Sequence, residues 1–226
     1  MREYDNEPVP GLPERLPKGE RIVWQGAPRW QSLTRQIFHP VSVTVYYGVL
    51  AIWFFLAAVY DGRPLGEAVS YIGYTAIVAG ISIGLLCALG YVMSRTTMYT
   101  ITNRRIVMRF GVAFPMAVNL PFSSIESADL KLWGDGSGNL PLRLNGDGRL
   151  AYLHMWPHVR PGRFREAEPM LRAVPNAQAV SQVLAEQWGA ALSKATDAPA
   201  SSPSPRRNER PSPATSPKSH GAVAAA

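Results

Sequence analysis

Two long stretches of the chain contain no charged residue, and they dominate its pattern of apolar and polar positions. The first runs from Val41 to Tyr60 and the second from Tyr71 to Met93. A helix of 20 residues is about 30 Å long, which matches the hydrocarbon core of a bilayer. The pattern therefore predicts two transmembrane helices, at 41–60 and 71–93, joined by a loop at 61–70.

The second apolar stretch carries small residues at every fourth position. They are Ala76, Gly80, Gly84 and Ala88. This spacing puts them on one face of a helix, where small residues let two helix backbones approach closely. The face has two open interpretations. It either packs against the first span of the same chain, or it docks a helix of another protein or of a second copy in a homodimer.

Arginines flank the two stretches unevenly. Arg21, Arg29 and Arg35 precede the first stretch, and only Arg63 lies in the loop. Basic residues collect on the cytoplasmic side of membrane proteins. We therefore expect both termini in the cytoplasm, the loop at 61–70 in the periplasm, and the chain in the inner or intracytoplasmic membrane. Four more arginines follow the second stretch, and they are candidate contacts for anionic lipid headgroups: Arg95, Arg104, Arg105 and Arg109.

Beyond residue 94 the apolar positions come in short alternating runs separated by turn residues, which is typical of strands. The predicted strands are Met98–Thr102, Arg105–Phe110, Ala113–Leu120, Ser127–Leu132, Leu140–Leu144 and Leu150–Met155. A tight turn is expected at Asn103-Arg104, and a hairpin turn at Asn145-Gly146-Asp147-Gly148. The spacing favours a small antiparallel barrel or sandwich in a domain at 94–195.

The two ends of the chain differ from this middle part. Residues 1–40 are polar and proline-rich, with a short strand expected within Glu20–Gly26 and an amphipathic surface helix at Trp30–Phe38. A final helix is predicted after Pro175 and Asn176. Its apolar stripe consists of Val180, Val183, Leu184 and Trp188. Residues 196–226 are rich in proline, serine and alanine, and we expect a disordered tail there.

Net charge and candidate chemistry narrow the function classes. The net charge of +7 favours anionic partners. Aromatic and basic residues do not interleave on one strand, which argues against nucleic acid. The lone Cys87 excludes a disulfide framework within one chain. The loop Gly134–Gly138 lacks the lysine of a phosphate-binding loop. No catalytic set of residues stands out, so we expect no enzyme and no cofactor.

Three histidines were weighed as ligands. His154 and His158 are four residues apart, but a strand is predicted there and Pro157 lies between them, so we expect a structural role rather than a metal site. His39 is placed at the cytoplasmic end of the first span. Ligation of a bacteriochlorophyll magnesium by His39 is an alternative to a plain interfacial histidine, which we favour.

The order of strands followed by a helix resembles a pleckstrin-homology (PH)-like barrel. Tyr99–Gly111 is similar to the opening hairpin of bacterial membrane-anchored PH-like domains, and Asn119–Ile125 resembles the next element of that group. The segment Gly19–Pro28 also fits the stretch before their spans. The fold class indicated by the resemblance is a two-helix transmembrane hairpin with a cytoplasmic PH-like antiparallel β-barrel, capped by a C-terminal helix.

One family in this group matches more closely. It is the photosynthetic complex assembly protein of purple bacteria, the PuhB family, whose gene accompanies that of the reaction-centre H subunit. The matching segments, within about residues 1–195, are Val9–Pro13, Asn119–Phe122, Ala151–His158 and Glu168–Arg172. Relatives are read with three spans, whereas this chain shows two.

The resemblance implies a non-catalytic assembly factor in the membrane. Its implied partners are subunits of the photosynthetic reaction centre and of the core light-harvesting complex, beside anionic membrane lipid. An alternative from another class is a PH-like lipid-binding or stress-sensing membrane module. A third possibility, pigment delivery, would need a magnesium ligand, for which the sequence offers only His39.

Overall fold

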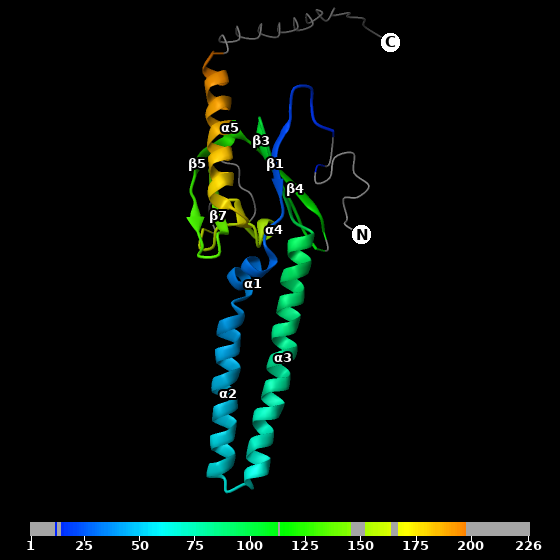
Figure 1. Cartoon of the computed structure of the whole chain (residues 1–226), viewed down its shortest axis with the longest axis vertical. Helices are drawn as coiled ribbons and strands as arrows, with labels where there is room; N and C mark the ends of the chain where they lie inside the picture. Colours follow the sequence, from blue (N-terminus) through cyan, green and yellow to red (C-terminus); the bar gives the residue numbers. More distant parts are fainter. Residues whose placement is uncertain (1–11, 13–14, 113, 146–151, 164–166, 198–226) are drawn as a thin grey trace, which may run out of the picture.

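The molecule consists of a pair of long helices that carries a β-rich domain at one end (Figure 1). The computed structural model describes residues 12, 15–112, 114–145, 152–163 and 167–197. The pair is formed by α2 (Pro40–Tyr60) and α3 (Leu65–Arg95), and α1 (Trp30–Phe38) lies where the pair meets the domain. The order predicted from the sequence, with two apolar helices before a β-rich domain, is confirmed.

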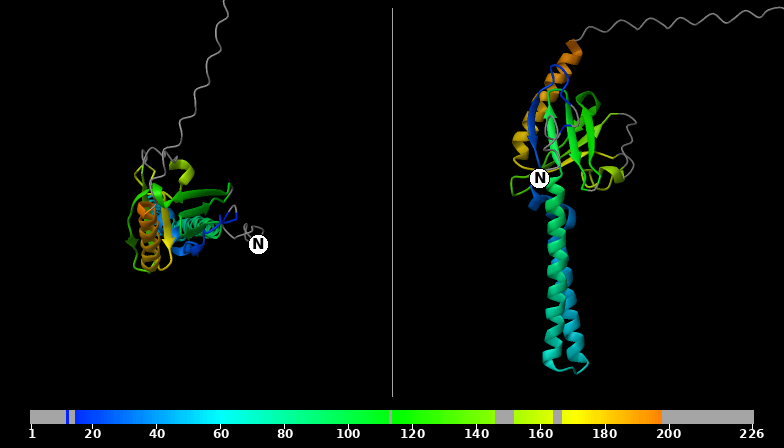
Figure 2. Two further views of the ribbon diagram at one scale, coloured as in Figure 1. Left: turned by 90° about the horizontal axis from the view of Figure 1, so that it is seen from above. Right: turned by 90° about the vertical axis from the view of Figure 1, so that its right-hand side faces the viewer.

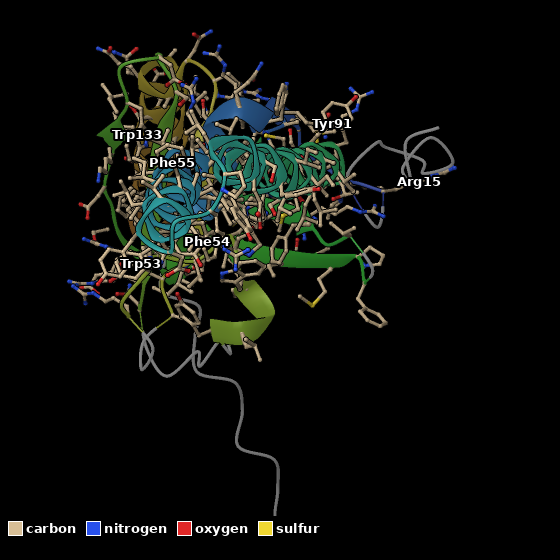
Figure 3. All side chains as sticks on the ribbon, turned by 90° about the horizontal axis from the view of Figure 1, so that it is seen from below. Arg15, Trp53, Phe54, Phe55, Tyr91 and Trp133 are labelled. Carbon is tan, nitrogen blue, oxygen red and sulfur yellow. The ribbon has the colours of Figure 1, made fainter. Side chains whose placement is uncertain are left out.

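Both long helices have the length and composition needed to cross a membrane, and few of their residues are buried. Figure 3 looks along the pair and shows Trp53 and Tyr91 on its outside. α3 begins at Leu65, so the predicted loop at 61–70 is too long, and the connection is only 61–64. An ion pair between Arg63 and Glu67 stabilises this early first turn, which a search for uncharged residues cannot detect.

The first of two antiparallel sheets combines one strand from before the helices with three strands that follow α3. Its strands, in spatial order, are β1 (Ile22–Gly26), β2 (Met98–Thr102), β3 (Arg105–Phe110) and β4 (Met116–Pro121). The predictions for β2 and β3 are confirmed to the residue. β4 begins three residues later than predicted, after Gly111 takes a positive φ of 126°. A Cβ at Gly111 would lie 2.1 Å from the Phe114 carbonyl oxygen, so this turn requires glycine.

The second sheet is built around β7 (Gly138–Leu144), which pairs with three strands. These are β5 (Ile125–Ala128), β6 (Lys131–Leu132) and β8 (Met170–Val174). A short 3-10 helix, η1 (Phe122–Ser124), links the two sheets. The single strand predicted at 127–132 is therefore divided. Asp129 and Leu130 lie between the two parts, although the Asp129 backbone N–H still donates to the Pro141 carbonyl oxygen of β7 at 3.1 Å.

Two further differences from the predicted strands occur near the end of the domain. The strand predicted at Leu150–Met155 is wrong, because Tyr152–Met155 forms the short helix α4. The strand β8 was not predicted, since all five of its residues are buried and show no alternation. The predicted hairpin turn at 145–148 falls mostly on residues outside the described part of the chain.

Apolar residues of both sheets and of α5 (Ala177–Asp197) form one core. α5 runs along the domain, as Figure 2 shows from two sides. Val180 and Leu184 of the predicted stripe are buried, and Trp188 packs against the core. The PH-like order of strands and capping helix is confirmed. The sheets do not close into a barrel, because no strand pair in the described residues joins β4 to the second sheet. Residues 198–226 lie outside the described part.

The helix α1 fixes the domain to the spans. A Cβ at Gly90 of α3 would lie 2.0 Å from the Thr34 hydroxyl oxygen, so only glycine allows α1 to pack this closely. Leu33 forms a small buried cluster with Met93 and Ala173. The Ser94 hydroxyl donates to the Pro28 carbonyl oxygen at 2.6 Å. The predicted helix at 30–38 is thus confirmed, and it packs against protein on its buried side.

Candidate functional site

A cleft of about 880 Å³ opens between α1 and the second sheet, beside the start of α2. It draws side chains from α1, from β6 and the loop after it, and from β8 and the segment before it. The polar residues that line it are Ser32, Arg35, Gln36, His39, Asp129, Lys131, Asp135, Ser137, Asn139, Arg160 and Arg172. Four of these are cationic and two are carboxylates, so the cleft carries net positive charge.

One wall of the cleft is the glycine-rich loop before β7. Asp135 in this loop accepts hydrogen bonds from the Ser137 backbone N–H at 3.0 Å and from the hydroxyls of Ser137 and Ser32. These hydrogen bonds, those from Ser137 first, hold the pKa of Asp135 at about 2. Arg29 also donates to the Asp135 carbonyl oxygen at 2.8 Å. The glycine-rich loop is therefore attached to α1 and to the residue before it.

The cations of the cleft differ in how far their charge is compensated. Arg160 lies 3.0 Å from Glu168 and 3.5 Å from Asp129. Arg172 is 9% exposed, and its guanidinium donates to the Val159 carbonyl oxygen at 3.2 Å. Its Nε is buried without a hydrogen-bond partner, and no carboxylate pairs with it in the described residues. Arg172 thus places a nearly buried positive charge beside the cleft without an anion.

A buried hydrogen-bond network lies behind Arg172 and reaches the end of α3. The Tyr99 hydroxyl accepts from the Arg172 backbone N–H at 3.1 Å, so we assign it as the donor to His158 Nδ1 at 2.7 Å. His158 Nε2 then donates to the Thr97 hydroxyl at 3.3 Å, and Thr97 donates to the Met93 carbonyl oxygen at 2.7 Å. The network connects the domain to the end of the second long helix.

Burial decides the protonation of this network. It lowers the pKa of His158 to about 3, and the positive charge of Arg172 acts in the same direction. Burial also raises the pKa of Tyr99 well above its ordinary value of 10.0. Both side chains are therefore neutral at pH 7, and neither compensates the charge of Arg172. His158 has the structural role that we expected from the sequence.

A second histidine considered as a ligand, His39, lies at the rim of the cleft. It ends α1 with a positive φ of 46°, immediately before Pro40 starts α2. Its ring is exposed, and it was weighed as a pigment ligand only as an alternative. In the part of the chain that the structure describes, no three His, Cys, Asp or Glu side chains gather in a way that would hold a metal ion.

The structure separates the four arginines proposed to contact lipid. β2 and β3 are antiparallel, with Met98 opposite Arg109 and Ile101 opposite Ile106. Arg109 therefore lies at the α3 end of the hairpin, like Arg95, while Arg104 and Arg105 lie at the far end. Arg105 also pairs with Glu20 at 2.8 Å. The four arginines thus lie at two ends of the hairpin, and their contact with lipid remains a prediction.

The small-residue face of α3 points away from α2. Ala76, Gly80, Gly84 and Ala88 are all exposed. A Cβ built on either glycine would meet no atom within 4 Å. The residues of α3 that are covered include Ala68, Thr75 and Gly90, on a different face. The interpretation that the small residues pack against the first span is therefore wrong, and a docking face for another helix remains.

Sequence reasoning missed the cleft. Its charged side chains come from positions between 35 and 172, and no local spacing connects them. The only signal in the sequence was an arginine, Arg172, among apolar residues in Met170–Val174. Chemically the cleft offers guanidinium and ammonium groups, with an amide at Gln36, and thus suits recognition of an anion.

Comparison with known proteins places the chain in a family. The sequence profile of the bacterial PH domain family matches residues 42–188, which include both long helices and most of the β-rich domain. The match covers more than half of the chain, and the chain belongs to this family.

A close relative comes from Rhodobacter capsulatus. It is 34% identical over 196 residues, which cover 85% of this chain and 90% of the relative. It is described as an uncharacterized 23.7 kDa protein in the puhA 5′ region. The resemblance to the family encoded beside puhA, noted from the sequence, is thereby confirmed.

Among solved structures, a DUF1696 family protein with a pleckstrin-homology domain from Shewanella loihica PV-4 is similar. The two are 14% identical, and the match covers 42% of this chain and 68% of that chain with a TM-score of 0.27. A score this low adds nothing to the assignment of the fold.

Proposed function

We propose that this chain is a non-catalytic membrane protein that assists assembly of the photosynthetic reaction centre and its core light-harvesting complex. The observation that carries the proposal is the relative in the puhA 5′ region, which matches along nearly its whole length. The resemblance to the PuhB family connects that gene position with the H subunit of the reaction centre. The proposed partners are reaction-centre or light-harvesting subunits.

The helix pair supports this role by offering a surface for a partner helix. Gly80 and Gly84 leave the backbone of α3 uncovered on its outer face. In lipid, apolar surface alone does not drive helices together, and close packing over small residues is a main source of affinity. A transmembrane helix of a photosynthetic subunit, or a second copy of this chain, is the proposed occupant.

The rigid attachment of the domain supports the same role. α1 packs against Gly90, and the Tyr99–His158 network links β2 to the end of α3. The domain therefore holds a fixed orientation relative to the helix pair. A partner that spans the membrane is then able to contact both parts at once.

The proposed location is the inner or intracytoplasmic membrane, with both termini in the cytoplasm. The arginine asymmetry supports this orientation, since Arg29, Arg35 and Arg95 lie at the domain end of the helices and Arg63 lies at the other end. The domain and the cleft then face the cytoplasm.

Deletion and complementation test the proposed function. The gene is removed from the phototrophic organism that encodes it, and assembled core complexes are quantified by their absorption in isolated membranes. Loss of core complexes, with recovery on return of the full chain, supports the proposal. Unchanged core complexes in the deletion strain contradict it and favour the alternative, a lipid-binding or stress-sensing module.

A further inference from the structure

The positive charge of the cleft is built in and is not balanced by the protein. Arg172 is the clearest case, because a guanidinium stays charged at every physiological pH and 91% of this residue's surface is covered. Burying a charge is costly unless it is paired. Tyr99 and His158, which lie beside Arg172, are neutral and do not balance its charge. A bound anion would supply the missing charge.

Two further side chains of the cleft lack partners. Arg35, in the last turn of α1, is exposed and makes no ion pair or hydrogen bond with the rest of the described chain. The amide of Gln36 has both its nitrogen and its oxygen buried without a partner. Together with Arg172 and Lys131, they surround a space of about 880 Å³. The carboxylates of the cleft, in contrast, are already occupied by Arg160 and by serine hydroxyls.

We infer that the cleft between α1 and the second sheet binds a phosphate group of net negative charge, held by Arg35, Gln36 and Arg172. Phosphate suits the site because its oxygens accept several hydrogen bonds from guanidinium groups at once. The inference goes beyond the proposed assembly role and does not depend on it. It also uses different residues from the arginine cluster that the sequence suggested.

The position of the cleft selects between two sources of phosphate. His39, at its rim, directly precedes the apolar helix α2. If α2 spans a bilayer, the cleft opens at the level of the lipid headgroups. The phosphate of an anionic lipid is therefore the expected source, and a free phosphate or soluble phosphate ester is the other.

The experiment uses the full chain in micelles of an uncharged maltoside detergent. Its thermal midpoint is followed during titration with dioctanoyl phosphatidylglycerol, dioctanoyl phosphatidylcholine or inorganic phosphate. A ligand that binds only the folded chain raises the midpoint. We expect phosphatidylglycerol to raise it and phosphatidylcholine to have a much smaller effect. A rise with phosphatidylglycerol alone identifies a lipid, and an equal rise with inorganic phosphate identifies free phosphate.

Two cleft variants and a control locate the binding. Arg35→Gln should weaken binding about tenfold, as expected for loss of one charged hydrogen bond. Arg172→Met should abolish the rise in thermal midpoint with phosphatidylglycerol, even if the substitution changes the midpoint of the ligand-free chain. Arg104→Gln, an exposed arginine at the far end of the β2–β3 hairpin, should bind like the unaltered chain.

Four results would overturn the inference. The first is no rise with any phosphate probe, and the second is an equal rise with both lipids. The third is a rise that Arg35→Gln and Arg172→Met leave unchanged, because the anion would then bind elsewhere. A rise with polyglutamate, where no phosphate probe acts, would also overturn it and would assign the cleft to an acidic protein segment.

Discussion

At the scale of single residues, burial and the charge of Arg172 together set the protonation of His158. Arg172 lies against Tyr99 and His158, and its charge adds to burial in keeping the imidazole unprotonated. Neutral His158 accepts a hydrogen bond on Nδ1 and donates one from Nε2, which a protonated ring could not do. The hydrogen-bonded link between the domain and α3 therefore requires that His158 be neutral.

A pH dependence of stability follows for His158. Its pKa is about 3 in the folded chain and 6.5 ordinarily. Between these values the unfolded chain binds a proton that the folded chain does not, so the free energy of unfolding falls as the pH is lowered from 6.5 toward 3. The contribution is at most about 1.4 kcal/mol per pH unit.

Thermal midpoints of the full chain in uncharged micelles, measured from pH 7 to pH 4, check this dependence. His158→Asn lowers the midpoint at pH 7 but should flatten its fall with pH. His39→Asn, at an exposed histidine, controls for the loss of an imidazole. If His158→Asn follows the same slope as the unaltered chain, His158 does not titrate as described.

Some residue roles could be read from the sequence and others could not. The structural role of His158 was predicted, because Pro157 breaks a helical ligand spacing. The strand β8 was missed since Met170–Val174 shows no alternation, and Arg172 was hidden with it. The charge of a buried arginine becomes informative only when its surroundings are known.

At the scale of elements, the attachment of α1 to α3 depends on one glycine. Gly90→Ala places a methyl group 2.0 Å from the Thr34 hydroxyl oxygen, so α1 has to shift. We expect a loss of about 1–3 kcal/mol in stability, as for other overpacked sites. Gly73→Ala is the matched control, because no atom lies within 4 Å of its added Cβ. Equal thermal midpoints for the two variants would contradict the proposed attachment.

The outer face of α3 gives a second prediction at this scale. Gly80→Leu combined with Gly84→Leu fills the open face without touching α2. We expect the chain to insert normally, since leucine raises hydrophobicity, and the yield of core complexes to fall. Gly48→Leu, on an open position of α2, should leave the yield unchanged. Normal yield in the double variant would show that this face has no important partner.

The elements were predicted best where the pattern is long or alternates. The two apolar stretches gave α2 and most of α3, and alternation located β2 and β3. The first turn of α3 was missed because Glu67 breaks the uncharged run. The helix α4 (Tyr152–Met155) falls within a predicted strand, because so short an apolar run fits either a helix or a strand. Which face of α3 is covered and which is open became clear only from the structure.

At the scale of the whole molecule, the orientation in the membrane is open to a direct test. We expect both termini in the cytoplasm, because the arginines gather at the domain end of the helices. A reporter active only in the periplasm should give no signal at the C-terminus and a strong signal when inserted after Gly62. Activity of the C-terminal fusion would reverse the orientation.

The molecule as a whole is a PH-family domain joined to two helices that are long and apolar enough to span a membrane, and it has two separate surfaces. One is the small-residue face of α3, and the other is the basic cleft beside α1. The proposed assembly role requires the small-residue face to contact a photosynthetic subunit, and the cleft is proposed to bind an anion. The two surfaces lie on different elements, so variants of one leave the other intact.

Co-purification tests the central claim most directly. The full chain is tagged at its C-terminus, recovered with mild detergent from phototrophically growing cells, and its partners are identified by mass spectrometry. The account predicts enrichment of reaction-centre or core light-harvesting subunits over an untagged control, and less of them with the Gly80→Leu and Gly84→Leu variant. Recovery of intact, membrane-derived chain without any of these subunits would contradict it.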